Sequence, residues 1–219
     1  MFTVAHTWGV RTDGVNPCWK VKRYKEMKRE RYLTADELAR LGQVLRESNS
    51  EPEAVSCIQL LLLTGCRLGE IQKLKWDYVD LDAGLLRLPD SKTGAKLVAI
   101  GHAVIEVFKT IPRIERNPYV ITGQVEGQHL TDMQRPWRRL RKLAGLDGLR
   151  IHDLRHSFAS DALQLGEDLP MIGKLLGHTQ VQTTARYAHL KTDPIRMAAD
   201  KVAGAIAQAL SQPVKQGAA

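Results

Sequence analysis

The apolar residues of this chain recur at helical spacing almost throughout, and one stretch, residues 78–100, breaks that period. There, short apolar segments are separated by turn residues, Ala83-Gly84 and Ser91-Lys92-Thr93-Gly94, which indicates strands joined by tight turns. The sequence therefore predicts a mixed fold, mainly α-helical, with a small three-stranded antiparallel β-sheet. The expected strands are residues 78–81, 85–88 and 96–100.

Capping residues and glycines mark the helices on either side of this stretch. Thr34-Ala35-Asp36-Glu37 has the pattern of a capping box, in which the Thr hydroxyl and the Glu carboxylate satisfy free amides at a helix start. Thr64-Gly65-Cys66 ends the second helix of the series. Helices are predicted after the capping box through Leu45 and over about 52–63, 67–74, 102–110, 131–144, 152–165, 168–176, 181–189 and 194–210.

Length and composition indicate one globular domain with a small appendage. The chain has 219 residues, and its 43% hydrophobic and 26% charged residues exclude a mostly disordered protein. Its cysteines form no CxxC pair, which indicates free thiols in a reducing compartment. Apolar runs such as 60–63 are too short to cross a bilayer, and the N-terminus lacks a hydrophobic segment of signal-peptide length. We therefore expect a cytoplasmic protein with no membrane partner.

The charge balance favours a polyanionic partner. The chain carries 32 Lys and Arg against 24 Asp and Glu, a net charge of +8, and nucleic acid is the commonest polyanion. A basic run follows a helix end at residues 1–8 and the turn residues 13–17. This run is either a solvated linker or a strap that follows DNA. Its residues are Lys20, Lys22, Arg23, Lys25, Lys28, Arg29 and Arg31, of which the six up to Arg29 are the candidate DNA-binding residues.

A helix start at residue 152 presents an anion-binding pattern. His152, Arg155 and His156 lie at positions i, i+3 and i+4, so a helix projects all three from one side. As a metal site this set is poor, because an Arg takes the central place and no further Cys or carboxylate completes it. The first turn of a helix adds its amides and dipole to the Arg fork and the imidazole. The alternative is a helix start with satisfied polar residues.

Other candidate residues have ordinary structural interpretations when each is taken alone. Arg67 lies near the packed interior, and Glu70, one helical turn on, can orient it as a simple salt bridge. His178 follows Gly177 at a predicted helix end, as a polar cap would. Tyr187, expected in the next helix, could be a half-buried packing residue.

Taken together, these residues form a metal-free set for phosphoryl transfer. A phenol that attacks a phosphodiester needs bidentate Arg side chains to neutralise the non-bridging oxygens. It also needs a base near the phenol and an acid near the leaving oxygen, which a histidine and a lysine in a β-turn could supply. No dense carboxylate cluster suggests a two-metal nuclease site.

The motifs that carry these residues resemble the catalytic domain of tyrosine recombinases, the phage-integrase family. The resemblance spans about residues 31–190, keeps the order of the family's motifs, and implies the catalytic-domain fold of that family. The matching stretches are Thr64-Gly65-Cys66-Arg67-Leu68-Gly69-Glu70-Ile71, Ser91-Lys92-Thr93-Gly94, His152-Asp153-Leu154-Arg155-His156-Ser157-Phe158-Ala159-Ser160, Leu175-Leu176-Gly177-His178 and Ala185-Arg186-Tyr187-Ala188-His189.

The resemblance implies a role for each residue that holds or attacks the phosphate. Tyr187 would be the nucleophile, which leaves a 3′-phosphotyrosyl link and a free 5′-hydroxyl. Arg67 and Arg155 would clamp the phosphate oxygens, and His178 would add a third hydrogen bond. The link conserves the phosphodiester energy, so strands can be rejoined without ATP, metal or cofactor.

It also implies roles for the residues that move protons or support the site. Lys92, in its β-turn, would protonate the leaving 5′-oxygen, with Lys96 as the rival lysine. His152 would serve as acid and base and help to deprotonate Tyr187. Glu70 would hold Arg67 without touching the phosphate, and His156 is expected to be structural.

Three parts of the chain are expected. Residues 1–30 would be the tail of a missing N-terminal core-binding domain plus the basic linker, and residues 31–190 the catalytic domain. Residues 191–219 would be a C-terminal helix and tail that could pack in trans on a neighbouring copy. The implied partners are double-stranded DNA and further copies of the chain, tetrameric in the family's synapse, in a bacterial, phage or mobile-element context.

The leading hypothesis is therefore a site-specific DNA recombinase that integrates or excises a mobile element. A type IB topoisomerase has similar chemistry but relaxes plasmid without a defined site or a partner protomer. A DNA-binding module without turnover is the alternative from another class. In that case Tyr187 would be present but its helix could rest withdrawn from the phosphate.

Overall fold

The computed structural model of the chain describes residues 2–10, 21, 24, 31–89, 94–178, 181–185, 187–188, 202–204 and 206–207. The chain divides into two compact units, residues 1–30 and residues 31–219. The first unit contains α1 (Phe2–Thr7). The six candidate DNA-binding residues of the basic run, Lys20, Lys22, Arg23, Lys25, Lys28 and Arg29, lie outside the described residues. Arg31, the last residue of that run, is described and pairs with Glu37.

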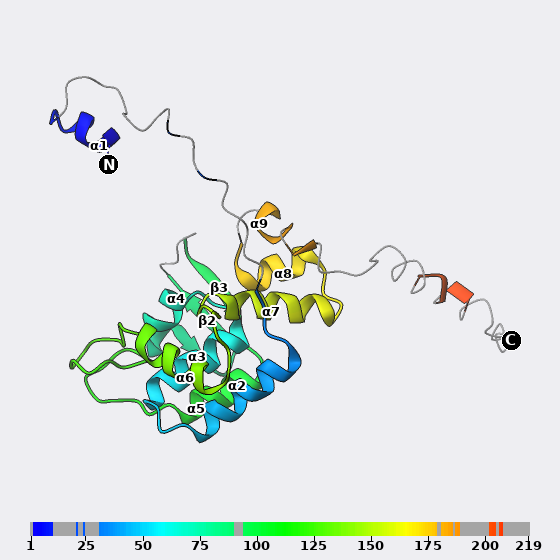
Figure 1. Cartoon of the computed structure of the whole chain (residues 1–219), viewed down its shortest axis with the longest axis horizontal. Helices are drawn as coiled ribbons and strands as arrows, with labels where there is room; N and C mark the ends of the chain where they lie inside the picture. Colours follow the sequence, from blue (N-terminus) through cyan, green and yellow to red (C-terminus); the bar gives the residue numbers. More distant parts are fainter. Residues whose placement is uncertain are drawn as a thin grey trace, which may run out of the picture. The chain divides into compact units, whose positions relative to one another are not determined.

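The second unit is mainly helical, with a small sheet, as predicted (Figure 1). None of its described helices is long and apolar enough to span a membrane. Its elements, in chain order, are α2 (Ala35–Glu47), α3 (Pro52–Thr64), α4 (Leu68–Gln72), the 3-10 helix η1 (Trp76–Tyr78), β1 (Val79–Asp80), β2 (Leu85–Leu88), β3 (Lys96–Ala99), α5 (His102–Thr110), α6 (Gln134–Leu143), α7 (Asp153–Gln164), α8 (Leu169–Leu176) and α9 (Val181–Ala185).

The predicted capping box at the start of α2 is confirmed. The Thr34 hydroxyl accepts a hydrogen bond from the Glu37 amide, and the Glu37 carboxylate accepts one from the Thr34 amide. The same carboxylate also accepts a hydrogen bond from Arg31, which lowers the pKa of Glu37 to about 2. One face of α2 buries Leu41 and Leu45 against the domain core.

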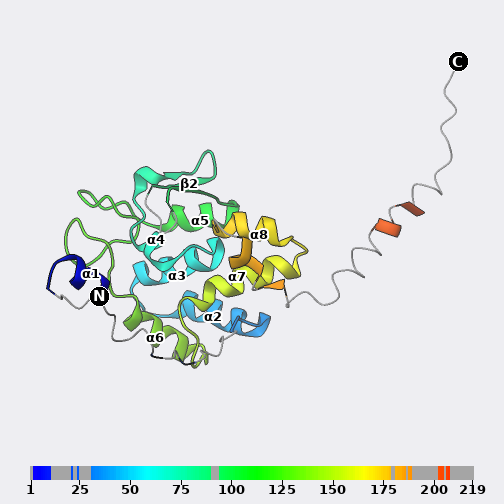
Figure 2. The ribbon, with the colours of Figure 1, turned by 90° about the horizontal axis from the view of Figure 1, so that it is seen from above.

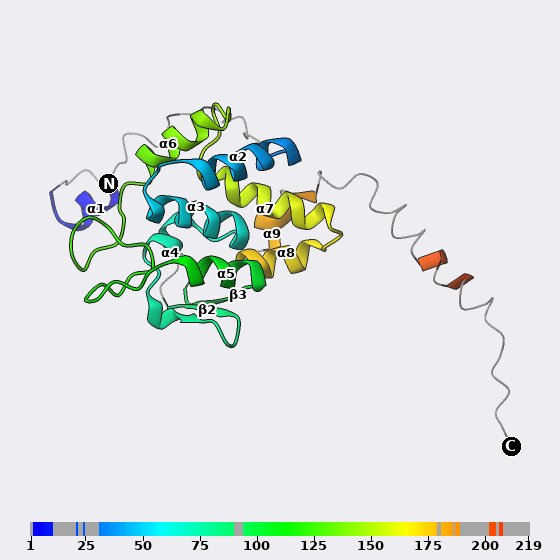
Figure 3. The ribbon, with the colours of Figure 1, turned by 90° about the horizontal axis from the view of Figure 1, so that it is seen from below.

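Helix α3 lies at the centre of the second unit, because it is apolar on almost every face. Figures 2 and 3 show it with α2 and α6 on one side and α5 with the sheet on the other. It packs against α4, α5 and α7. Gly65 ends α3 in the left-handed conformation with φ 62°, a region that glycine adopts at low cost.

The predicted strands form an antiparallel sheet in the order β1-β2-β3. Leu86 pairs with Val98 across the β2–β3 ladder, and both side chains are buried in the core. The first strand is shorter than predicted, because residues 76–78 form the 3-10 helix η1 and pairing begins at Val79. The turn residues 91–93, Lys92 among them, lie outside the described residues.

Helix α9 is also shorter than predicted, and Tyr187 does not belong to it. The helix ends at Ala185 instead of continuing to residue 189. The Tyr187 amide bonds to the Thr184 carbonyl at 3.0 Å, an i−3 bond that tightens the chain beyond the helix. Thr183 and Thr184 are β-branched and weaken a helix at this point. Of the expected helix at 194–210, only residues 202–204 and 206–207 are described, and these are helical.

Gly65 gives the first prediction, because its missing side chain makes room for two neighbours. A Cβ atom there would lie 2.6 Å from a ring carbon of Phe158 and 2.9 Å from Leu176. Gly65→Ala should therefore combine left-handed strain with overpacking and lower the free energy of unfolding by about 3 kcal/mol. Urea denaturation measures this change.

Gly145→Ala is the matched control for this prediction. Gly145 has nearly the same backbone angle, φ 65°, but a Cβ atom there would meet nothing within 4 Å. It should cost only the backbone strain, about 1 kcal/mol. Equal losses for the two variants would contradict the overpacking argument.

Candidate active site

Arg155 lies at the centre of the candidate site, on the first turn of α7. Its side chain is 5% exposed and donates hydrogen bonds to two main-chain carbonyls, Gly65 O at 2.6 Å and Leu176 O at 2.9 Å. Burial lowers the pKa of the Arg155 guanidinium, and the nearby positive charge of Arg67 lowers it further. A charge held in this way is stabilised by an anion that reaches both guanidinium groups.

Arg67 is held by Glu70 from one turn along α4, as predicted from the spacing. The Arg67 guanidinium donates to one Glu70 oxygen at 2.8 Å, and the Arg67 amide donates to the other at 2.8 Å. The structure adds a third partner, because the Lys96 ammonium on β3 donates to Glu70 at 2.8 Å. Burial alone would raise the pKa of the Glu70 carboxyl, but these partners together lower it.

Lys96 lies close to the site, although sequence reasoning ranked it behind Lys92. Its side chain is 9% exposed and runs beneath Gly177, where a Cβ atom would lie 2.7 Å from Lys96 Cδ. Its ammonium is engaged by Glu70, a geometry suited to orienting the carboxylate that holds Arg67. Lys92 is not among the described residues, and its role in protonating the leaving oxygen stays a prediction.

His178 follows α8 at its left-handed C-cap, Gly177. Its Nδ1 atom lies 2.8 Å from the Thr184 hydroxyl, which is almost fully buried under α8. This contact fixes one edge of the imidazole through its Nδ1 atom. Thr184 was not singled out from the sequence, because a lone Thr in a short helix carries no distinguishing pattern.

Tyr187 lies against two of the helices that build the candidate site, α7 and α8. Its side chain is only 5% exposed and packs in a cluster with Ile172 and Leu176 of α8. Its hydroxyl lies 2.7 Å from His156 Nδ1, and the two ring centroids are 5.8 Å apart. Tyr187 is also close enough to Arg155 to favour the charged guanidinium electrostatically.

His152 and His156 contact one another edge to face at the start of α7. His152 is the residue before the helix, and its ring centroid lies 5.0 Å from that of His156, with an interplanar angle of 86°. The spacing predicted a shared side of the helix for these two rings and Arg155. It did not predict that His156, taken as structural, would be the ring in contact with the Tyr187 hydroxyl.

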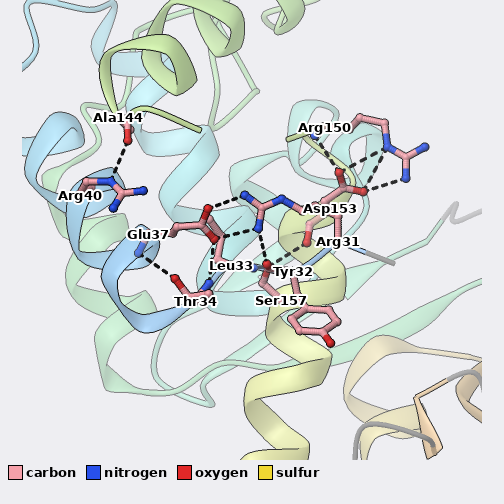
Figure 4. Close-up of polar contacts among 10 residues, drawn as sticks. All are labelled: Arg31, Tyr32, Leu33, Thr34, Glu37, Arg40, Ala144, Arg150, Asp153 and Ser157. Carbon is pink, nitrogen blue, oxygen red and sulfur yellow. Dashed lines mark hydrogen bonds and ion pairs between the residues drawn. The ribbon is translucent and has the colours of Figure 1, made fainter. Parts of the chain in front are cut away.

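Residues 31–34, at the start of the second unit, are bonded to the first turns of α7. The buried Leu33 amide donates to the Ser157 hydroxyl at 2.8 Å, and that hydroxyl donates to the Asp153 carbonyl (Figure 4). The Asp153 carboxylate, fully buried, accepts hydrogen bonds from the amide and guanidinium of Arg150. These contacts fix the register of the helix start relative to the domain.

The site therefore brings together residues from four separate parts of the chain. Arg67 and Glu70 come from α4, Arg155 from α7, His178 from the end of α8 and Tyr187 from beyond α9. Within the described residues, no group of three or more His, Cys, Asp or Glu side chains is placed to hold a metal ion. The arrangement suits the binding of a tetrahedral anion beside a phenol.

Residues 31–193 match the model of the phage integrase family, which is about three quarters of the chain. The chain belongs to the phage integrase family. The family membership that the order of the motifs suggested is thus confirmed.

Relatives in the family are recombinases. The shufflon-specific DNA recombinase of Escherichia coli is 29% identical over 195 residues, which cover 87% of this chain and 48% of that protein. The tyrosine recombinase XerC of Xanthomonas axonopodis pv. citri is 30% identical over 165 residues, covering 72% and 53%. This integrase-family chain spans about half the length of these curated relatives.

Solved structures of family members have the same fold. The crystal structure of XerA recombinase matches with a TM-score of 0.62 and 27% identity, over 78% of this chain and 64% of that one. A λ integrase fragment, residues 75–356, solved as a dimer bound to a COC′ core site, matches with a TM-score of 0.62 and 26% identity, over 83% and 69%. The catalytic-domain fold that the resemblance implied is confirmed.

The Glu70 ion pairs predict a pH-dependent stability. The pKa of Glu70 is lowered, so its carboxylate stabilises the fold above its unfolded pKa of about 4.3, and this contribution is lost as the pH falls through the folded pKa. Glu70→Gln should cost about 3 kcal/mol at pH 7, because Lys96 loses its buried partner. Urea denaturation should show this deficit shrinking below about pH 4.

Glu126→Gln is the control, since Glu126 is exposed on a loop and takes part in none of the ion pairs among the described residues. It should leave the free energy of unfolding within about 0.5 kcal/mol of the wild type. A deficit of Glu70→Gln that stays constant from pH 7 to pH 3 would contradict the assignment of Glu70 as an ionised partner.

The paired arginines predict stabilisation by oxyanions. Sulfate between Arg67 and Arg155 would offset the repulsion that lowers the pKa of Arg155. Sulfate at about 100 times its dissociation constant should add about 2.7 kcal/mol to the free energy of unfolding. Thermal unfolding in sulfate and in chloride at equal ionic strength measures this, and Arg67→Gln should abolish the difference. An equal response of wild type and Arg67→Gln would refute a shared anion site.

Proposed function

We propose that this chain is the catalytic domain of a site-specific DNA recombinase that cleaves and rejoins strands through a 3′-phosphotyrosyl intermediate. The single observation that carries the proposal is the position of Tyr187. Its hydroxyl is held on α7, beside a buried Arg155 that is itself next to Arg67. A phenol beside paired guanidinium groups is suited to attack on a phosphodiester.

In the proposed cleavage step, Tyr187 Oη forms a bond to phosphorus as the bond from phosphorus to the 5′-oxygen breaks. Arg67, Arg155 and His178 hydrogen-bond to the non-bridging oxygens, where negative charge grows. Lys92 gives its proton to the leaving 5′-oxygen, and the phenolic proton passes to a histidine of α7. Attack by a second strand's 5′-hydroxyl reverses these transfers, so rejoining needs no ATP.

The partners follow from the same chemistry. The substrate is double-stranded DNA, and exchange between two duplexes requires several copies of the chain, a tetramer in the family's synapse. Two of the relatives reported above, a shufflon-specific DNA recombinase and XerC, support a role on bacterial or mobile DNA. We also propose that the protein acts in the cytoplasm, where such DNA lies, and that residues 191–219 pack on a neighbouring copy.

A topoisomerase-like activity and a binding module without turnover are the alternative functions. A topoisomerase would relax plasmid as a single protomer without a defined site. A binding module would hold DNA and never form a covalent link. The held hydroxyl of Tyr187 favours turnover, because a module that only binds DNA needs no oriented phenol.

The proposal predicts a covalent adduct that depends on one oxygen atom. A pool of supercoiled plasmids that carry random inserts is incubated with the full chain in EDTA and quenched with detergent. Wild-type protein should become linked to nicked DNA, and Tyr187→Phe should reduce the linked fraction below about 1%, because the nucleophile is gone. Phenol extraction followed by gel analysis measures the linked fraction.

Tyr119→Phe is the matched control, since the contacts described for the Tyr119 ring are with His129 and Lys75 and not with Tyr187 or the two arginines. It should form adduct at the wild-type rate, and DNA affinity should be nearly equal for all three proteins. A detergent-resistant adduct from Tyr187→Phe would show that Tyr187 is not the nucleophile. Relaxed plasmid without sequence preference would favour the topoisomerase, and DNA binding with no adduct would favour the binding module.

A further inference from the structure

We propose that His156 is a further catalytic residue, whose Nδ1 atom takes the phenolic proton of Tyr187 during attack. The proposal rests on the function proposed above and names the group that activates its nucleophile. It departs from the sequence-based expectation, in which His152 had this role and His156 was structural.

The first argument is the geometry of the hydroxyl. The Tyr187 Oη atom lies 2.7 Å from His156 Nδ1, a short hydrogen-bond distance at which the hydroxyl can donate to the ring nitrogen. A base must lie within hydrogen-bond reach of the proton that it removes, and this contact already meets that condition without DNA. The rings are tilted by 57° with centroids 5.8 Å apart, so the contact is made at the ring edge.

The second argument is the support of the His156 ring. His156 is on the regular part of α7, adjacent in sequence to the buried Arg155, so the helix fixes its backbone. The ring of His152 packs edge-on against it at 5.0 Å. His152 therefore limits the rotation of His156 and keeps Nδ1 directed at the phenol.

The third argument is the charge around the phenol. Tyr187 from beyond α9 and His152 from the same helix both face His156, and the Arg155 guanidinium interacts electrostatically with Tyr187. Arg155 favours the phenolate that forms when the proton leaves. Because Tyr187 is almost fully buried, bulk water is a poor competitor for that proton.

The step balances without a co-reactant. The oxygen–hydrogen bond of Tyr187 breaks, its electron pair forms the bond from Oη to phosphorus, and the proton moves to the lone pair of a neutral His156. The leaving 5′-oxygen takes a separate proton, assigned above to Lys92. In the reverse step, the His156 imidazolium returns its proton to Oη as the phosphotyrosyl bond breaks.

Two substitutions separate the hydrogen bond from the proton transfer. In Asn, the side-chain oxygen or nitrogen occupies about the place of His Nδ1, so His156→Asn can keep the contact but cannot act as a base at neutral pH. In Gln, the amide reaches the place of Nε2 instead, so His156→Gln loses the contact. His102→Asn, on the exposed start of α5, is the control.

The contact is measured in the full chain without DNA. The five tyrosines are labelled with carbon-13 at the Cζ atom, and Tyr187→Phe identifies the resonance of Tyr187. That resonance should shift in His156→Gln and stay near the wild-type position in His156→Asn. The other four tyrosine resonances report on folding and should not change. An unchanged Tyr187 resonance in His156→Gln would overturn the proposal.

The proton transfer is measured as the rate of adduct formation on the plasmid pool with random inserts. His156→Asn should react about 100-fold more slowly than wild type at pH 7. Its rate should then rise about tenfold per pH unit between pH 7 and pH 9, as hydroxide replaces the missing base. A purely structural defect would give a slow rate with no such recovery, and that outcome would overturn the proposal.

The remaining outcomes separate this proposal from the function on which it rests. Equal rates for wild type and His156→Asn would refute the role of His156 and leave the recombinase function intact. No adduct from wild type, with the Tyr187 resonance still dependent on His156, would refute the proposed function and the proton transfer with it. His102→Asn should match wild type in both measurements.

Discussion

The arrangement of the site depends on the two hydrogen bonds that Arg155 donates to main-chain carbonyls. One acceptor is the carbonyl of Gly65, at the end of α3, which packs in the large core cluster. The other is the carbonyl of Leu176, at the end of α8, which packs in the smaller cluster around Tyr187. The guanidinium therefore joins the two apolar clusters while its own position is fixed by both. A single buried cation thus supports the packing of α8 and also lies beside Arg67 in the candidate anion site.

Much of this architecture could be predicted from the sequence, because its signals are local. The capping box at Thr34, the glycines that end α3 and α8, and the change of period at residues 78–100 each act within a few residues. The pairing of Arg67 with Glu70 is also local, at one helical turn. The motif order then assigned Arg155, His178 and Tyr187 to one site before their positions were known.

The parts that could not be predicted depend on contacts distant in sequence. Lys96 meets Glu70 across 26 residues, and His156 meets Tyr187 across 31, so neither pair leaves a periodic signal. The end of α9 was also missed, because the helical pattern continues while β-branched Thr184 bonds to His178 and the chain tightens at Tyr187. Tertiary contacts determine where Lys96, His156 and the end of α9 lie, and local helix or strand propensity carries no information about such contacts.

The anchor between Leu33 and Ser157 has a mechanical consequence. The chain enters the second unit through residues 31–34, and the first buried bond that it makes there is to α7. The hydrogen bond from the Leu33 amide to the Ser157 hydroxyl thus links the incoming chain to α7, the helix that carries Arg155 and His156. Tension on the polypeptide upstream of residue 31 would therefore be transmitted to α7 and shared with the Arg150–Asp153 pair at its start.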